Sequence, residues 1–214
     1  MTPTESSAAK PPLITPTFVL AWVANFCQFL VFYLFVTTMA LYAVESFGAS
    51  DTVGGFASSA FVLGATCMRV FSGWIVDRVG HKKAALASLA FVTVVAVAYF
   101  FAHNVAFLII VRMVHGAAYA LTSTALMAVA QSVIPHERRA EGTGYFALGT
   151  TLATAFGPAI GLLLANNIGY TTLFAVALGA NIVSLILALV LRYPAEVSSE
   201  KPAFSLRNAV HPNV

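Results

Sequence analysis

Long apolar runs separated by short polar turns make up most of this chain. Six such runs can be counted, at approximately residues 17–44, 52–76, 84–102, 104–134, 139–166 and 169–192. A helix that crosses a hydrocarbon core of about 30 Å needs about 20 predominantly apolar residues. Because lipid offers no hydrogen-bond partners to the backbone, segments that are apolar throughout cross it as helices. The pattern therefore predicts an all-α membrane protein with six transmembrane helices.

The composition favours a membrane protein over a soluble one. The chain is 59% hydrophobic and only 9% charged, whereas about 25% of the residues of a typical soluble domain are charged. Its mean hydropathy is +0.86. The lipid bilayer is therefore the first partner that we expect.

The basic residues are distributed unequally between the two sides of the predicted membrane domain. With six spans, successive loops alternate sides, and the Lys and Arg residues in the tails, in the loops and at the ends of the spans all fall on one side. The positive-inside rule places that side, and with it both termini, in the cytoplasm. The same rule explains the net charge of +3 without a nucleic-acid partner. The residues concerned are Lys10, Arg78, Lys82, Lys83, Arg138, Arg139, Arg192, Lys201 and Arg207.

Polarity divides the chain into three regions. Residues 1–16 are polar and Pro-rich, and we expect a disordered cytoplasmic tail there. Residues 17–192 form the six-helix transmembrane domain, and residues 193–214 are expected to be a cytoplasmic linker that would precede a seventh helix. Within the domain, segments 54–66 and 142–154 both begin with paired glycines before an aromatic residue. This faint repeat predicts two three-helix units in inverted orientation.

Residue patterns that carry enzymatic chemistry are absent from the sequence. HERRA (136–140) begins like the zinc-binding H-E-x-x-H pattern, but Ala140 stands where the second histidine is required. No Ser or Cys nucleophile has a recognisable partner pattern, and no phosphate-binding glycine loop with a lysine occurs. We therefore expect no enzyme, no cofactor and no metal site.

The densest charge cluster is GWIVDRVGHKK, from Gly73 to Lys83, which we term the charged hairpin. An ordinary positive-inside loop would explain its basic residues but not Asp77 or its spaced glycines. The hairpin resembles the loop between the second and third helices of major facilitator superfamily transporters, although that family usually has Arg or Lys where His81 stands. The resemblance implies a latch that closes the cytoplasmic side when Asp77 contacts a helix terminus in the other half of the transporter. The implied latch residues are Arg69, Gly73, Asp77, Arg78, Gly80, Lys82 and Lys83.

A second motif, LIIVRMVHGAAYA (108–120), resembles the fourth-helix motif of the same superfamily, in which an intramembrane Arg precedes a Gly by four residues. A buried Arg is costly in hydrocarbon and normally faces a polar cavity. Alternatively, Arg112 bonds backbone carbonyls and His115 merely packs. With no Asp or Glu deep in any span, His115 is the titratable candidate for coupling transport to protons. The expected polar wall on the first and fourth helices comprises Asn25, Gln28, Arg112, His115, Gly116 and Tyr119.

A third motif lies in the fifth run, where ATAFGPAIGLLLA (153–165) presents small residues at four-residue spacing. Such a stripe lets helix backbones approach closely in lipid, and alone it would mean only packing. Its G-P-x-x-G core resembles the motif of the antiporter branch of the superfamily, and residues 138–161 resemble bacterial exporters that include metallophore and opine exporters. Ala153 replaces the first glycine of that family motif. The helix-packing motif comprises Gly149, Ala153, Gly157, Pro158 and Gly161.

Together, these resemblances imply the N-terminal half of a secondary active transporter in the bacterial inner membrane. It would export small amphipathic organic molecules by proton antiport with alternating access, so the expected partners include the substrate and H⁺. The second half would be the missing C-terminal half or a second copy in a parallel homodimer, and the chain would be a fragment, a split transporter or a self-pairing half. The alternative is a non-transporting membrane module that assembles with itself or with a partner helix bundle.

Overall fold

Six long helices make up most of the part of the chain that the computed structural model describes, residues 11–193. Each overlaps one predicted run, which confirms the all-α, six-helix prediction, and these residues contain no strand. Most of the predicted tail (1–16) and linker (193–214) lies outside them, as do Lys10, Lys201 and Arg207. The helices are α1 (Pro16–Phe47), α2 (Asp51–Val79), α3 (His81–Ala98), α4 (Val105–Val133), α5 (Arg139–Asn167) and α6 (Tyr170–Val190), with the short 3-10 helices η1 (Tyr99–Phe101) and η2 (His136–Arg138).

Local side-chain chemistry sets several helix ends. Thr15 caps α1 by accepting a hydrogen bond from the backbone N–H of Phe18 at 3.1 Å, and Asn104 caps α4 by accepting one from Phe107 at 2.8 Å. Such caps satisfy N–H groups that the first helical turn leaves without a partner. Gly48, which ends α1, and Gly80, which joins α2 to α3, have φ angles of +64° and +95°. Glycine adopts these left-handed conformations without steric cost, so the connections can be very short.

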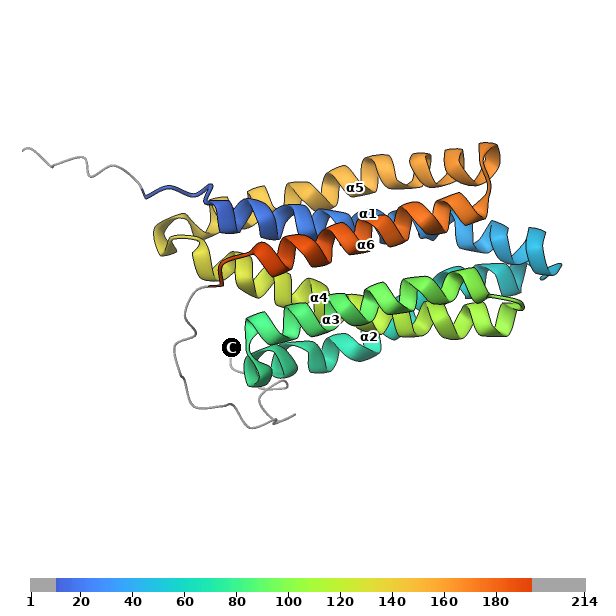
Figure 1. Ribbon diagram of the computed structural model, residues 1–214, viewed down its shortest axis with the longest axis horizontal. Coiled ribbons are helices and arrows are strands. Elements are labelled where there is room, and N and C mark those ends of the chain that lie inside the picture. The colour runs from blue at the N-terminus through green and yellow to red at the C-terminus, as the bar shows by residue number, and fades with distance from the viewer. Residues whose placement is uncertain (1–10, 194–214) are drawn as a thin grey trace, which may run out of the picture.

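The helices form two layers, with α1, α5 and α6 in one and α2, α3 and α4 in the other (Figure 1). In the first layer α5 and α6 both pack on α1, and in the second α2 and α3 both pack on α4. Exchanging the first three helices for the last three therefore preserves this pairing. The one marked difference is that α2 also packs along α1, whereas α5 barely contacts α4. This pairing agrees with two three-helix units, while their inverted orientation stays a prediction.

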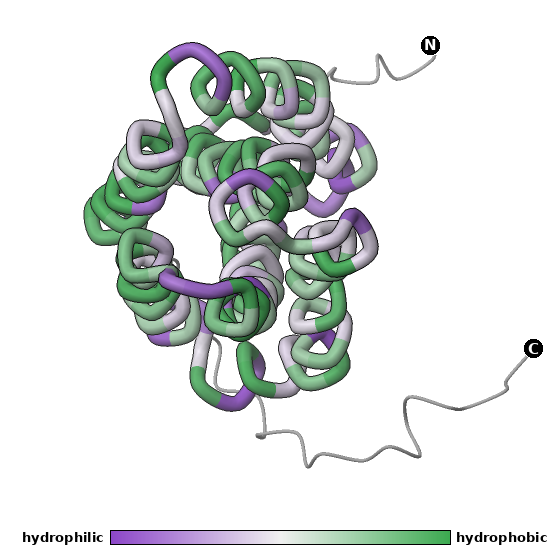
Figure 2. Tube along the Cα trace, turned by 90° about the vertical axis from the view of Figure 1, so that its right-hand side faces the viewer, coloured by the Kyte–Doolittle hydropathy of each residue, from purple (hydrophilic) through white to green (hydrophobic). Residues whose placement is uncertain are grey.

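The outer surface of the bundle is apolar. All six long helices are long and apolar enough to cross a membrane, and apolar residues predominate along them in the end-on view of Figure 2. Helix α5 is the most exposed, since only 22% of its most apolar window is buried inside the bundle. Its outward side chains include Leu148, Phe156 and Leu163, which are 50%, 56% and 58% exposed. Lipid or another helix must cover such a face.

Candidate functional site

The charged hairpin lies at one end of the bundle, where α2 ends and α3 begins (Figure 1). Asp77, Arg78, Lys82 and Lys83 are exposed, and the guanidinium carbon of Arg78 lies 5.6 Å from the ring centroid of Trp74. The single ion pair found between residues 11 and 193 joins Arg138 to Glu141 at 2.7 Å, so Asp77 has no cationic partner within this part of the chain. The Asp77 carboxylate is therefore available to a group outside it.

Other predicted latch residues continue along the same face of α2. Arg69 and Gly73 lie two turns and one turn before Asp77, and both are exposed. A side chain added at Gly73 would meet no atom within 4 Å, so no helix of the described residues packs closely there. Val62 and Thr66 extend this exposed face towards the other end of α2. Arg69, Gly73 and Asp77 thus share one stripe that the rest of the bundle leaves uncovered.

Arg112 lies on α4 and is completely buried. Its Nη2 donates a hydrogen bond to the Ser58 carbonyl of α2 at 2.9 Å, and its Nε donates one to the Ala57 carbonyl at 3.4 Å. The guanidinium carbon also lies 4.8 Å from the ring centroid of Phe61, and the face of an aromatic ring attracts a cation at this distance. Backbone carbonyls and aromatic rings therefore surround the charge. This arrangement agrees with the alternative in which Arg112 bonds backbone carbonyls instead of facing a polar cavity.

His115, one turn further along α4, is also buried, with 1% of its surface exposed. Its Nδ1 lies 2.9 Å from the hydroxyl of Tyr99, which is in η1. The rings of Phe35 and Phe61 pack edge-on against its imidazole. The sequence analysis did not identify Tyr99, because nothing in the sequence pairs the end of the third run with the middle of the fourth. His115 thus packs inside an aromatic cluster that also contains one polar partner.

Gln28 on α1 belongs to a different cluster. Its Nε2 donates a hydrogen bond to Oδ1 of Asn181 on α6 at 3.0 Å, and Asn181 donates in turn to the Ala177 carbonyl at 3.1 Å. Asn25 is buried nearby on the same helix, while Tyr119 of α4 is buried against aromatic rings of α1. The structure therefore divides the residues of the predicted polar wall between separate clusters. Asn181 was missed in the sequence, although an Asn in the middle of the sixth run is an unusual residue that could have indicated it.

The small-residue stripe of α5 faces α1. A Cβ added at Gly157 would lie 2.5 Å from Cβ of Tyr33, and one added at Gly161 would lie 2.5 Å from the Leu34 carbonyl oxygen. Gly149 leaves room for the indole of Trp22, which an added Cβ would approach to 3.2 Å. Ala153 lies in the same stripe and is fully buried, whereas Pro158 is half-buried. The predicted packing motif therefore mediates the close approach of α5 and α1.

An equally close approach joins α2 and α4, and it uses one glycine from each helix. A Cβ at Gly116 would overlap the Phe61 carbonyl, and a Cβ at Gly64 would overlap the Met113 carbonyl. Gly116 belongs to the predicted motif, but Gly64 was not singled out, because an isolated glycine in an apolar run does not show what lies opposite. This contact brings the α2 carbonyls within reach of Arg112.

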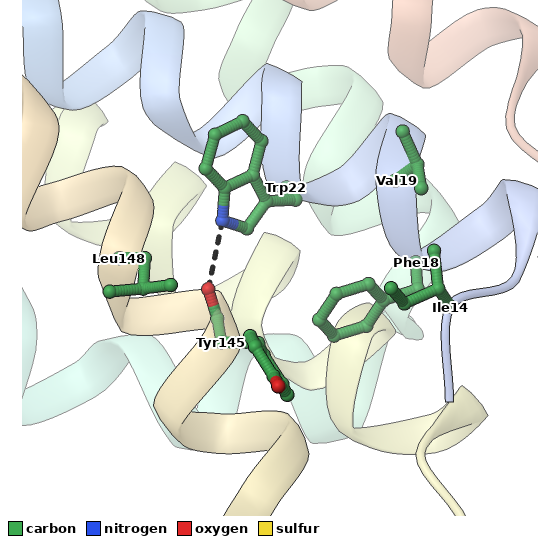
Figure 3. Close-up of a pocket in the computed structure, with 6 residues that line it drawn as sticks. All are labelled: Ile14, Phe18, Val19, Trp22, Tyr145 and Leu148. Atoms are coloured by element: carbon green, nitrogen blue, oxygen red, sulfur yellow. Dashed lines mark hydrogen bonds between the residues drawn. The ribbon is translucent and has the colours of Figure 1, made fainter. Parts of the chain in front are cut away.

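A small pocket opens between α1 and α5 near the cytoplasmic end predicted for the bundle (Figure 3). Its volume is about 200 Å³, and its walls are almost entirely apolar. The indole Nε1 of Trp22 donates a hydrogen bond to the Tyr145 carbonyl at 3.0 Å, so the ring bridges the two helices. Pockets that enclose drug-sized ligands are usually 300–1,000 Å³. The six lining residues are Ile14, Phe18, Val19, Trp22, Tyr145 and Leu148.

Residues that could hold a metal ion do not gather anywhere in the part of the chain that the structure describes, because no three His, Cys, Asp or Glu side chains come together there. Both cysteines are free thiols, with Cys27 buried and Cys67 exposed. The geometry is that of a helical bundle with buried polar clusters and a charged, exposed rim.

Comparison with known proteins gives a consistent result. The family model described as Major Facilitator Superfamily matches residues 21–212. The chain is 31% identical over 133 residues to the staphylopine export protein of Staphylococcus aureus, covering 61% of this chain and 32% of that protein. It is 29% identical over 161 residues to the multi-drug resistance efflux pump PmrA of Streptococcus pneumoniae, covering 72% of this chain and 39% of the pump.

The fold also matches a solved structure. The crystal structure of a peptide transporter, POT, in complex with sulfate superposes on this chain with a TM-score of 0.73 at 15% identity. The match covers 81% of this chain and 37% of the transporter. At this level of identity the match establishes a shared fold alone. In each of these comparisons the chain spans well under half the length of the protein that it matches.

Proposed function

The chain belongs to the major facilitator superfamily, and from this premise we propose that it forms the N-terminal six-helix half of a secondary active transporter. The proposed activity is export of small amphipathic organic molecules by proton antiport with alternating access. The names of two relatives, an export protein for staphylopine and a multidrug efflux pump, support export. The six apolar helices and the family membership identify an integral, multi-pass membrane protein.

We further propose a location in the bacterial inner membrane with both termini in the cytoplasm. The described basic residues outside the helix interiors support this orientation, because the charged hairpin, the α4–α5 connection and the end of α6 all lie at the same end of the bundle (Figure 1). The turns at the opposite end contain no Lys or Arg. Loops with an excess of Lys and Arg stay on the cytoplasmic side.

The exposed stripe on α2 carries the functional proposal. Arg69, Gly73 and Asp77 face away from the rest of the bundle, and Asp77 forms no ion pair between residues 11 and 193. A carboxylate is stabilised at a helix N-terminus, where the backbone N–H groups carry partial positive charge. We propose that Asp77 makes such a contact with the other half of the carrier while the cytoplasmic side is closed, and loses it on opening.

The test compares two carboxylates at opposite ends of the same helix. In the complete transporter, Asp77→Asn should reduce transport of a fluorescent efflux substrate, whereas Asp51→Asn should leave it unchanged, because Asp51 is exposed at the far end of α2. Membrane abundance of each variant is measured in parallel. Unchanged transport by Asp77→Asn at equal abundance would refute the latch.

Proton coupling is a separate part of the proposal. Asp and Glu are absent from the middle of all six spans, which leaves His115 as the titratable candidate in this half. Its burial and its contact with Tyr99 require that a proton reach it in another conformation. His115→Gln should abolish the dependence of export on an imposed pH gradient in proteoliposomes, while His103→Gln, in an exposed loop, should preserve it. Retained coupling in His115→Gln would place the coupling group elsewhere.

A second candidate function is a non-transporting module that assembles with another copy or with a partner bundle. The exposed apolar face of α5 favours it, because that face is the least covered of the six. Cross-linking in native membranes distinguishes the two. Transport by the captured and reconstituted complex supports the carrier, and assembly without uptake or export supports the module.

A further inference from the structure

The chain does not leave the bundle directly when α6 ends at Val190. We term residues Leu191 to Tyr193 the exit segment. Leu191 is 4% exposed and packs in a cluster with Phe18 and Phe146, and the Arg192 carbonyl accepts a hydrogen bond from the Thr17 hydroxyl at 3.2 Å. The exit segment therefore lies across the end of the bundle and is anchored to it.

Tyr193 ends this segment and bridges several helices. Its hydroxyl donates a hydrogen bond to the Ala188 carbonyl of α6 at 3.0 Å. Its side chain packs against a cluster made by Val76 of α2, Ala84 and Ala85 of α3, and Ala125 of α4. The Tyr193 side chain thus links α6 to a cluster that α2, α3 and α4 form at the base of the charged hairpin.

The ring also contacts the charge cluster. The ammonium nitrogen of Lys82 lies 5.8 Å from the ring centroid of Tyr193, within the range of a cation–π interaction. Lys82 therefore lies towards the exit segment and forms no ion pair with Asp77. Burial raises the pKa of Tyr193 to about 12, so the hydroxyl stays a neutral donor throughout the physiological range.

We propose that Tyr193 is a positioning residue for the charged hairpin: its ring fixes the start of α3 and holds Lys82 away from Asp77. The inference rests on the proposed latch, because it assigns Tyr193 the task of keeping the Asp77 carboxylate free for the other half. This positioning role does not depend on the substrate.

The experiment measures accessibility of the hairpin base by thiol labelling of the full chain in detergent micelles. The reporter is Ala84→Cys, which replaces a residue that is 2% exposed under Tyr193, in a background where Cys27 and Cys67 are changed to Ser. A matched reporter, Ala102→Cys, replaces a residue that is 8% exposed beyond the far end of α3. A water-soluble maleimide then reports how often each position opens.

Tyr193→Leu removes the ring and should increase labelling at position 84 at least about threefold, a factor within the range of a cation–π contact, with no change at position 102. Tyr193→Phe keeps the ring and should increase labelling at position 84 less than Tyr193→Leu does, because the hydrogen bond that it loses joins Tyr193 to α6 and not to the hairpin. Lys82→Met should raise labelling of position 84 in the parent but should not raise it further in Tyr193→Leu.

In the complete transporter, Tyr193→Leu should reduce transport, whereas Tyr193→Phe, which keeps the ring, should retain it.

Two outcomes would overturn the inference. Parental labelling of position 84 in Tyr193→Leu would show that the ring does not position the hairpin, and equal increases at positions 84 and 102 would show only a general loss of stability. Because labelling requires no transport, these outcomes are independent of the Asp77→Asn test. A failed latch and a failed positioning residue are thereby distinguished.

Discussion

The α2–α4 and α1–α5 contacts both join the two three-helix units, and they correspond to each other when the first three helices are exchanged for the last three. The two contacts nevertheless achieve close approach differently. Between α2 and α4, each helix contributes one glycine, Gly64 or Gly116, against the backbone of the other. Between α1 and α5, the glycines come from α5 alone, and α1 presents Tyr33 and Leu34. The reciprocal contact lets two backbones meet at two points, whereas the one-sided contact leaves large side chains of α1 in the interface.

The two contacts also differ in charge. Arg112 lies in the α2–α4 contact, where two α2 carbonyls accept its hydrogen bonds. Those carbonyls come within reach because Gly116, four residues along α4, lets α2 approach. The α1–α5 contact contains no charged side chain, and Trp22 bridges it through one hydrogen bond to Tyr145. Close backbone approach therefore serves packing in both contacts, but in only one does it also accommodate a cation.

The largest expected effect on folding comes from Gly116→Ala. The added methyl group would overlap the Phe61 carbonyl, which belongs to a helix backbone and cannot rotate away. Overpacking of this kind typically costs about 1–3 kcal/mol, and we expect the upper part of that range. The free energy of unfolding, measured by denaturant titration in mixed micelles, should fall accordingly.

A matched control for Gly116→Ala is Gly55→Ala, at a helical glycine whose added Cβ would meet nothing within 4 Å. It should be neutral or slightly stabilising, because Ala has the higher helix propensity. Equal stability of Gly116→Ala and Gly55→Ala would mean that α2 and α4 do not approach each other as closely as the contact at Gly116 requires.

A smaller loss is expected for Gly161→Ala in the one-sided contact. Its added Cβ would lie 2.5 Å from the Leu34 carbonyl oxygen, so α5 must shift, but no second glycine contact from α1 resists that shift. We expect a loss of about 1–2 kcal/mol in the same titration. Gly144→Ala, at a position of α5 with open space around it, is the control. A loss equal to that of Gly116→Ala would remove the distinction between the two contacts.

Helix number and position could be predicted from the sequence because apolar runs of spanning length have one stable conformation in lipid. The predicted helix boundaries were less accurate where charged residues belong to a helix instead of a loop. The third run was expected to begin at residue 84, but α3 begins at His81. Gly80 alone makes the turn, so His81, Lys82 and Lys83 form the first turn of the helix instead of a loop. A charge cluster in the sequence does not show how few residues the reversal needs.

The candidate site was predictable only where its residues repeat along one helix. The stripe on α5 and the latch face of α2 follow from spacing, and the structure places each set on one face. Tyr99, Asn181 and Gly64 escaped prediction because each acquires its importance from a residue on another helix. The packing of α1 on α6 likewise turns Gln28 towards Asn181, away from the His115 cluster. Such pairings depend on tertiary structure that spacing does not encode.

A smaller change again is expected for Gly149→Ala, at the end of the α5 stripe. Here the added Cβ would approach the Trp22 indole to 3.2 Å, and an indole can tilt where a backbone cannot. Helix propensity offsets part of the cost, so the free energy of unfolding should change by less than about 1 kcal/mol. The tilt would lengthen the hydrogen bond from Trp22 to Tyr145, and tryptophan fluorescence should shift. A loss as large as that of Gly161→Ala would mean that Trp22 is held as rigidly as a helix backbone.

The smallest effect on folding is expected for Arg112→Met, although it removes the residue that distinguishes the two contacts. Met fills a similar volume, and the Ala57 and Ser58 carbonyls lie inside α2, where they can accept bonds from the helix itself. Replacing buried charge with well-packed apolar groups is often neutral or stabilising, so the unfolding free energy should be unchanged or higher.

Arg112→Lys should be less stable than Arg112→Met, because it keeps a buried charge and loses the planar guanidinium that reaches two carbonyls. If Arg112→Met folds as predicted and the complete transporter carrying it no longer transports, the cation is retained for function. A large loss of stability in Arg112→Met would instead make the charge a structural requirement of the α2–α4 contact.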